Sequence, residues 1–227
     1  MATFEIIEGQ PGQGKSLYTA RVAGKLLKRN KKTYNKLGVK RVIYSNIKFS
    51  DEFENEAGDY LCYWSNLNDL LQLRDVDLLW DEVATELDSR NFANLSEEVK
   101  RFLSQYRKRG IDIYANTQDF SMIDIRARMF TTRVATLYKI LGSPDPSPTK
   151  PKVENIWGLI LVREVQNYKA DDPHKKEYSF LPSFFFIDKE LVERYDTRQD
   201  IPKSEAPPLK KEVRVCFEDG FKRVRYY

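Results

Sequence analysis

The stretch Gly9-Gln10-Pro11-Gly12-Gln13-Gly14-Lys15-Ser16 fits the phosphate-binding loop (Walker A) pattern G-x-x-x-x-G-K-[ST] at every fixed position. A short apolar segment, 4–8, precedes it, and a segment with helical spacing, 17–27, follows it. The pattern requires this strand–loop–helix order, because backbone N–H groups and the helix N-terminus must converge on phosphate oxygens. The sequence therefore predicts that the chain binds a nucleoside triphosphate.

Each part of this loop has an expected role in holding ATP and Mg²⁺. Lys15 would reach the β- and γ-phosphates, and the hydroxyl group of Ser16 would ligate the metal ion. The residues expected to contact the nucleotide are Gly9, Gln10, Pro11, Gly12, Gln13, Gly14, Lys15, Ser16 and Leu17.

A second motif predicts that the bound nucleoside triphosphate is hydrolysed. The run Val76-Asp77-Leu78-Leu79-Trp80-Asp81-Glu82 is mostly apolar and ends in two carboxylates, as expected for a buried parallel strand beside the loop. We expect Asp81 to hold Mg²⁺ through water, and Glu82 to orient and polarise the attacking water. An acidic pair at a strand end is common by itself, but its position after a complete phosphate-binding loop favours the catalytic interpretation.

Composition limits the class of protein. The 227 residues are enough for one α/β domain with additions, and 32% of them are charged. No apolar run approaches the ~20 residues that span a bilayer, and we expect no cleaved leader because the loop begins at residue 9. Cys62 and Cys216 match no metal spacing, and His174 is the only histidine, so a histidine-based site is nearly excluded.

Charge and cysteine usage bear on partners and location. The net charge of +4 is compatible with nucleic acid, although a solvated basic face would have the same composition. Two distant cysteines favour a reducing compartment. The expected location is therefore a reducing cytosol.

The chain is predicted to have an α/β core followed by β-rich additions. A helix is expected over 97–109, capped by Ser96 and stopped by Gly110. Its expected buried stripe is Val99, Phe102, Leu103 and Tyr106. The predicted divisions are the ATPase core 1–142, a proline-rich loop 143–151, a β-hairpin and helix 152–197 that complete the domain, and a C-terminal extension 198–227 with a hairpin.

Shorter segments are assigned from composition and alternation. The predictions are an acidic exposed loop at 51–59, strands at 156–168 and 178–187, a short helix at 188–195, and a hairpin whose strands flank Glu218-Asp219-Gly220.

The strand 111–118 is expected to lie between the first strand and the acidic strand in space. Gln118 at its end would then sit over the γ-phosphate, where its amide could sense hydrolysis. The alternative is an ordinary polar residue that ends a strand.

Several of these segments together resemble the ATPase domain of the zonular occludens toxin (Zot) family. That family includes filamentous-phage assembly proteins and belongs to the FtsK–HerA group of DNA-translocating ATPases. The likeness covers roughly residues 2–197. It is found in Gly9–Ser16, Leu78–Val83, Arg107–Asp119, Ile123–Arg126, Phe186–Asp188 and Arg194–Thr197.

The resemblance implies a RecA/FtsK-like P-loop NTPase fold, with a mostly parallel sheet flanked by helices and C-terminal β additions. It also implies a homo-oligomeric ring, expected to be a hexamer, that drives viral DNA during virion assembly. Capsid, portal or membrane-bound phage proteins are candidate partners. The implied location is the host cytoplasm, with attachment to a virion or to a peripheral assembly site as the alternative. Filamentous-phage members continue into a membrane span and an outer domain that this sequence does not show, so the resemblance does not extend to membrane-embedded export. Packaging ATPases of tailless membrane-containing phages are soluble members of the same broad group and of similar size.

A ring of this kind needs an arginine from one subunit near the γ-phosphate of its neighbour, worth ~10³-fold or more in rate. We favour Arg126 or Arg128, which follow the sensor strand on a segment expected to face a neighbour. For each single arginine, an ordinary surface cation is the alternative. The candidates are Arg107, Arg109, Arg126, Arg128 and Arg133.

Three functions remain open at this point. The first is an ATP-driven DNA translocase, and the second is an ATP-binding switch or scaffold protein at a phage assembly site. A nucleotide or small-molecule kinase is less favoured, because the acidic pair and Thr117-Gln118 suit water as the acceptor.

Overall fold

The fold is arranged around β1 (Phe4–Glu8), a central strand whose five residues are all buried. The structure is a computed structural model that describes residues 2–142, 158–179, 181–194, 213–218 and 221–226. β1 is paired in parallel with β5 (Asp112–Thr117) on one side and β6 (Arg133–Gly142) on the other. The remaining strands extend the sheet outward from these three.

The main sheet has nine strands, in the order β3-β2-β4-β5-β1-β6-β7-β8, and β9 also pairs with β7. Strands β1 to β6 run parallel, whereas β7 runs antiparallel to β6, β8 and β9. The predicted α/β class with a mostly parallel sheet is confirmed. The other strands are β2 (Ile43–Ser45), β3 (Leu61–Tyr63), β4 (Asp77–Trp80), β7 (Gly158–Tyr168), β8 (Lys176–Tyr178), β9 (Ser183–Ile187), β10 (Val213–Glu218) and β11 (Phe221–Tyr226).

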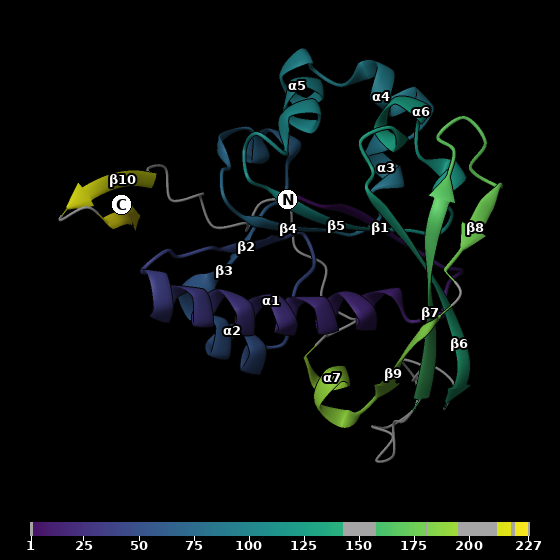
Figure 1. Cartoon of the computed structure of the whole chain (residues 1–227), viewed down its shortest axis with the longest axis horizontal. Coiled ribbons are helices and arrows are strands. Elements are labelled where there is room, and N and C mark those ends of the chain that lie inside the picture. Colours follow the sequence, from purple (N-terminus) through teal and green to yellow (C-terminus); the bar gives the residue numbers. More distant parts are fainter. Residues whose placement is uncertain (1, 143–157, 180, 195–212, 219–220, 227) are drawn as a thin grey trace.

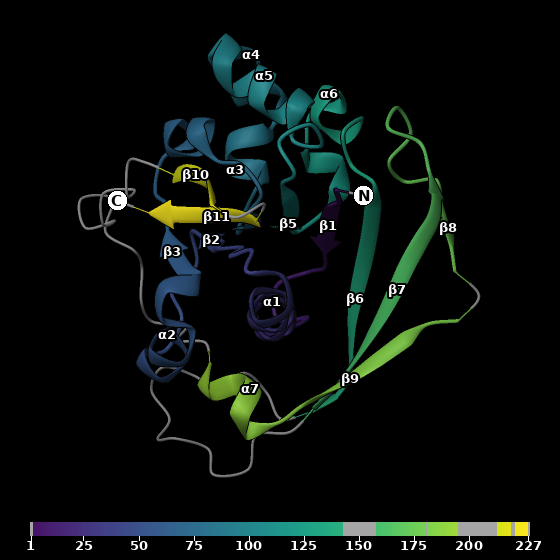
Figure 2. The same ribbon diagram turned by 60° about the vertical axis from the view of Figure 1, so that its left-hand side comes forward.

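Helices cover both faces of the sheet (Figures 1 and 2), with α1, α2 and α7 on one face and α3 to α6 on the other. Neighbouring residues of β1 enter different cores because strand side chains alternate: Ile7 packs on the α1 side and Ile6 on the other. The helices are α1 (Lys15–Leu37), α2 (Asp51–Ala57), α3 (Ala84–Leu87), α4 (Ser89–Asn94), α5 (Glu97–Gln105), α6 (Ile125–Arg128) and α7 (Lys189–Glu193), with 3₁₀ turns η1 (Gly58–Tyr60), η2 (Leu67–Gln72) and η3 (Phe120–Met122).

The predicted position of the third site strand is confirmed, because β5 lies between β4 and β1. The register pairs Trp80 with Ala115, and Glu8 with Thr117. Parallel strands end at the same edge of a sheet, so the segments that follow β1, β4 and β5 converge there. This edge holds the residues that the sequence motifs single out.

Two predicted elements are correct in kind but differ in detail. The helix predicted over 97–109 ends at Gln105, although Ser96 caps it by accepting a hydrogen bond from the backbone N–H of Val99 at 3.3 Å. Gly110 has φ of 69°, the left-handed conformation expected after a helix. The predicted strand 178–187 is divided into β8 and β9, and both of these pair with β7.

The prediction of an exposed loop at 51–59 is wrong, because Asp51–Ala57 is helix α2. Ser50 caps this helix by accepting a hydrogen bond from the backbone N–H of Phe53. Acidic residues in its first turn suit the positive end of the helix dipole. Phe53 and Ala57 are buried against the α1 side of the sheet, and this apolar contact fixes the helix.

The C-terminal predictions are only partly covered by the described residues. The hairpin is present, with β10 and β11 antiparallel and Val213 paired with Tyr226. The predicted loop 143–151 and the first part of the predicted extension, 198–212, lie outside the described residues, so the domain divisions there stay predictions. Within the described ranges, no helix combines the length and the apolar composition that a bilayer crossing requires.

A network of hydrogen-bonded charged side chains lies at the sheet edge where β4 and β5 begin. Asp77 is fully buried and accepts hydrogen bonds from Arg29 at 2.6 and 2.7 Å, from Asn30 at 2.8 Å and from Arg41 at 2.8 Å. Arg41 also donates to Asp112 at 2.9 Å. One buried carboxylate therefore joins α1, the segment before β2 and two strands.

Candidate functional site

The glycine-rich loop joins β1 to α1 and requires glycine at its tightest points. Gly12 and Gly14 have φ of 78° and 89°, a left-handed conformation that other residues adopt only with strain. A Cβ atom on Gly14 would lie 2.2 Å from Cδ1 of Ile160 on β7. The pattern's second glycine is therefore required by backbone conformation and by packing.

The N-terminus of α1 is open at this loop. Gly14, the N-cap residue, provides no side-chain hydrogen bond, and the first turn of α1 has no acidic residue. The first backbone N–H groups of a helix have no partner inside it and carry partial positive charge. Gln13 does not cover them, because its Oε1 accepts a hydrogen bond from the backbone N–H of Lys139 on β6 at 2.5 Å. An anion is the ligand that suits such a terminus.

Lys15 folds back over the loop in this structure. Its Nζ donates to the backbone oxygen of Gly9 at 2.6 Å and to that of Gln10 at 3.3 Å. Burial lowers the pKa of Lys15, and the charges of Asp81 and Glu82 oppose this shift. The ammonium group therefore interacts with both carboxylates of the acidic motif.

Asp81 is held by a relay of side chains that the sequence did not indicate. One of its carboxylate oxygens accepts a hydrogen bond from Nδ2 of Asn116 at 2.9 Å, and Oδ1 of Asn116 accepts one from the Thr19 hydroxyl group at 3.0 Å. Asn46 holds the backbone of Asp81 on the other side, through bonds of 2.7 and 3.2 Å. The relay connects α1, β5 and the end of β4.

Glu82 has a strained backbone. Its φ is 50°, which is uncommon for a residue with a side chain and costs on the order of 1 kcal/mol or more. Its backbone oxygen accepts hydrogen bonds from the N–H and the hydroxyl group of Thr85, both at 2.8 Å. The resulting turn leaves the side chain of Glu82 exposed to solvent.

The other residues of the predicted site lie around the same loop, and the structure brings them to one edge. Gln10 and Pro11 are exposed at the loop tip, whereas Ser16 and Leu17 are half-buried in the first turn of α1. Gln118 follows β5 and is also exposed. The buried residue Asn116, two positions earlier, forms the hydrogen-bonded relay instead.

The two favoured arginines differ in accessibility. Arg126 is half-exposed, pairs with Asp124 at 2.9 Å and lies over the ring of Phe92 at 4.6 Å. Arg128 is 9% exposed, and its Nε and one terminal nitrogen have no hydrogen-bond partner among the described residues. The assignment of Arg126 or Arg128 as the arginine that completes a neighbour's site stays a prediction; in the structure the side chain of Arg128 is buried, whereas that of Arg126 reaches solvent.

Comparison with solved structures tests this arrangement at the level of the whole fold. The N-terminal domain of zonular occludens toxin from Neisseria meningitidis superposes with a TM-score of 0.54 at 19% sequence identity, over 86% of this chain and 100% of that domain. The chain has the fold of a Zot N-terminal domain. The sequence resemblance to the Zot family is thereby confirmed as a structural relationship.

Two weaker similarities are to other solved structures. The genome packaging NTPase B204 from Sulfolobus turreted icosahedral virus 2, in complex with AMPPCP, gives a TM-score of 0.48 at 12% identity over 78% of this chain and 96% of that one. The flagellar accessory protein FlaH from Methanocaldococcus jannaschii gives 0.45 at 15% identity over 81% and 89%. The sequence matches no known family profile and no curated relative.

A buried ion pair in this Zot-like fold lies directly before the glycine-rich loop. Glu8 on β1 accepts two hydrogen bonds from Nζ of Lys176 on β8, at 2.6 and 2.7 Å. It also accepts from the hydroxyl group of Thr136 at 2.6 Å and from the backbone N–H of Phe120 at 3.1 Å. Sequence reasoning missed this cluster; a glutamate inside an apolar strand was the available signal, because a buried carboxylate needs partners.

If the chain hydrolyses ATP with Mg²⁺ held by Asp81, as the sequence predicts, replacing Asn116 with alanine should weaken that turnover. The change removes the donor that orients Asp81, and outer-shell partners of metal ligands are worth roughly 10–100-fold in affinity or activity. The measurement is the Mg²⁺ concentration for half-maximal turnover, with thermal unfolding recorded alongside. Asn94→Ala, at an exposed position of α4, is the matched control and should leave that concentration unchanged; equal effects of the two changes would contradict the role given to Asn116.

Proposed function

We propose that this chain binds ATP with Mg²⁺ and hydrolyses it to translocate viral DNA during virion assembly, acting as a ring of identical subunits, six in the expected form. The observation that carries the ATPase part is the open N-terminus of α1, where the charges of Asp81 and Glu82 act on Lys15. The assembly part rests mainly on the sequence resemblance to the Zot family. The shared Zot fold is consistent with it, but a fold by itself does not fix function.

In this proposal the loop and Lys15 bind the triphosphate. The backbone N–H groups of the first turn of α1 donate to phosphate oxygens, and the left-handed glycines allow the backbone to come close. Lys15 exchanges its bonds to the backbone oxygens of Gly9 and Gln10 for bonds to the β- and γ-phosphates. This exchange replaces neutral acceptors with charged ones, which form stronger hydrogen bonds.

Ser16 and Asp81 are suited to hold Mg²⁺ beside the phosphates. Both offer oxygen ligands, which Mg²⁺ prefers, and Mg²⁺ is commonly bound by one or two protein groups together with phosphates and waters. When bound, the ion supplies charge neutralisation at the phosphates. Asn116 fixes one oxygen of the Asp81 carboxylate through a hydrogen bond of 2.9 Å, so the carboxylate is oriented before any ligand arrives.

Glu82 is the group that accepts a proton from the attacking water. Its exposed carboxylate follows Asp81, and the strained turn at φ 50° sets its direction. Placing water against the γ-phosphate is the main task, because phosphoryl transfer depends on positioning and charge stabilisation. Arg126 is the favoured residue for completing the site of a neighbouring subunit.

One experiment tests the motor against the alternative of an ATP-binding switch or scaffold. ATP turnover is measured with and without DNA, and particle mass is measured with and without a non-hydrolysable ATP analogue. The motor predicts DNA-stimulated turnover, a nucleotide-dependent ring, and DNA affinity that falls steeply with salt. Binding of ATP with no effect of DNA on turnover would favour the switch, and a phosphorylated small-molecule product would favour a kinase.

A further inference from the structure

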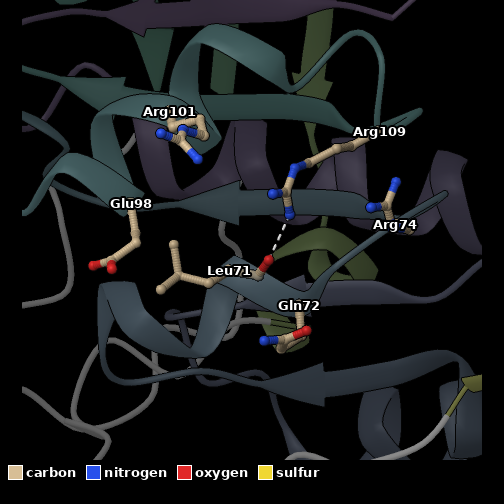
Figure 3. A pocket seen from close by; sticks show the side chains of 6 residues that line it. All are labelled: Leu71, Gln72, Arg74, Glu98, Arg101 and Arg109. Carbon is tan, nitrogen blue, oxygen red and sulfur yellow. Dashed lines mark hydrogen bonds between the residues drawn. The ribbon is translucent and has the colours of Figure 1, made fainter.

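A basic pocket lies at the sheet edge opposite the glycine-rich loop. Its volume is about 300 Å³, and it lies between η2, which leads into β4, and α5, which leads into β5 (Figure 3). The residues that line it are Leu71, Gln72, Arg74, Glu98, Arg101 and Arg109. The Asp77 network uses none of these side chains, and neither do the loop and acidic motif of the ATPase site; Arg109, one of the sequence candidates for the trans arginine, lies at this pocket.

The lining combines three arginines with one glutamate. In the view of Figure 3, the guanidinium group of Arg109 lies between those of Arg101 and Arg74, and the carboxylate of Glu98 points away from it. Arg74 and Arg101 are exposed, so both can move to meet a ligand. The net positive charge of the lining selects an anion and repels a metal cation.

Arg109 is held in place within this pocket. One terminal nitrogen donates to the backbone oxygen of Leu71 at 2.5 Å, and the guanidinium group lies 5.5 Å from the ring centre of Phe102. Its Nε is buried and has no hydrogen-bond partner among the described residues. A fixed guanidinium group with an unused donor loses little conformational freedom when it binds an acceptor.

The arginines also destabilise one another when the pocket contains no anion. Burial lowers the pKa of Arg109, and the charge of Arg74 lowers it further. An anion between the two would remove this repulsion and gain charge-assisted hydrogen bonds. The arrangement thus favours a negatively charged occupant over an empty pocket.

We propose that the pocket lined by Arg74, Arg101 and Arg109 is a binding site for a phosphate group. The planar fork of arginine matches phosphate geometry better than it matches a monatomic anion. The volume leaves room for the groups attached to a phosphate ester. The phosphate would belong either to a nucleic-acid backbone or to free inorganic phosphate, and both present the same oxygens. The site is independent of the proposed ATPase activity.

The test uses Arg74→Glu/Arg101→Glu, which reverses the two exposed charges and keeps Arg109 on Leu71. The matched control is Lys32→Glu/Lys36→Glu on α1, which makes the same net charge change at exposed positions on the opposite face of the sheet. Each pair is combined with Lys15→Ala, so that phosphate binding at the glycine-rich loop is weakened in all samples. Far-ultraviolet circular dichroism checks folding, and Arg74→Gln and Arg101→Gln replace the double variant if it does not fold.

Two ligands are titrated into both proteins. Labelled mixed-sequence DNA is followed by fluorescence anisotropy over a range of salt concentrations, and inorganic phosphate is followed by calorimetry. If the site takes backbone phosphates, the pocket variant should lose about tenfold or more in DNA affinity relative to the control. The slope of log affinity against log salt concentration should also decrease by the contribution of about two phosphate contacts.

Retained DNA affinity with loss of the inorganic phosphate signal would identify free phosphate as the ligand. If neither ligand distinguishes the pocket variant from the control, the proposal is overturned. None of these outcomes depends on ATP turnover, so failure of the pocket and failure of the proposed motor are separate results.

Discussion

Changing Glu82 to glutamine should lower ATP turnover by about 10²–10⁴-fold while leaving ATP affinity nearly unchanged. The amide keeps the size of the side chain and the turn at φ 50°, but it cannot take a proton from water. Because Glu82 is exposed, the change should not disturb packing. Turnover by phosphate release and affinity by titration with a fluorescent ATP analogue give the two quantities.

Lys15→Ala is the comparison that separates binding from chemistry. Removing the ammonium group should raise the dissociation constant of ATP, because the phosphate charge loses its main cation. The two variants should therefore fail in different ways. Hydrolysis at the wild-type rate by Glu82→Gln would show that the catalytic assignment is wrong.

Asp77→Asn is expected to give the largest loss of stability, about 3 kcal/mol, because it leaves two arginines around a neutral group in a buried position. Arg29 and Arg41 both donate to this carboxylate, and it is fully buried. The measurement is the free energy of unfolding from urea titration, followed by tryptophan fluorescence. The fluorescence is informative because Trp64 and Trp80 are in the buried core.

The control for this prediction is Asp59→Asn. Asp59 pairs with Lys40 at 3.5 Å, but its side chain is 79% exposed. A surface pair of this kind contributes at most about 1 kcal/mol, so the unfolding midpoint should change little. Equal destabilisation by the two changes would mean that the buried network contributes no more than a solvated ion pair.

Local pattern was enough to predict the parts of the site that are contiguous in sequence. The loop from Gly9 to Ser16 was predictable because its glycines, lysine and serine each satisfy a separate steric or chemical requirement. The strand before Asp81 was predictable from its apolar run, and the position of β5 followed from the order of the motifs. The segment 51–59 was predicted as a loop because it is mostly acidic. Helix α2 within it buries only Phe53 and Ala57, so its apolar pattern is weak.

Long-range contacts account for what the sequence did not predict. Asn116 and Gln118 are both polar residues near one strand end, and only tertiary packing decides that Asn116 meets Asp81. Glu8 and Lys176 are 168 positions apart. The inward turn of Arg128 likewise depends on how α6 packs, which no spacing of apolar residues specifies. Sequence reasoning therefore names catalytic candidates, which stay predictions, but does not identify the residues that hold their side chains in place.

The Glu8–Lys176 pair has a consequence for how the molecule could change shape. The carboxylate of Glu8 accepts hydrogen bonds from β6, from β8 and from the segment after β5. A shift of any one of these segments alone would leave this buried charge without one of its partners. We expect β1, β6, β8 and η3 to behave as a single rigid block during a catalytic cycle.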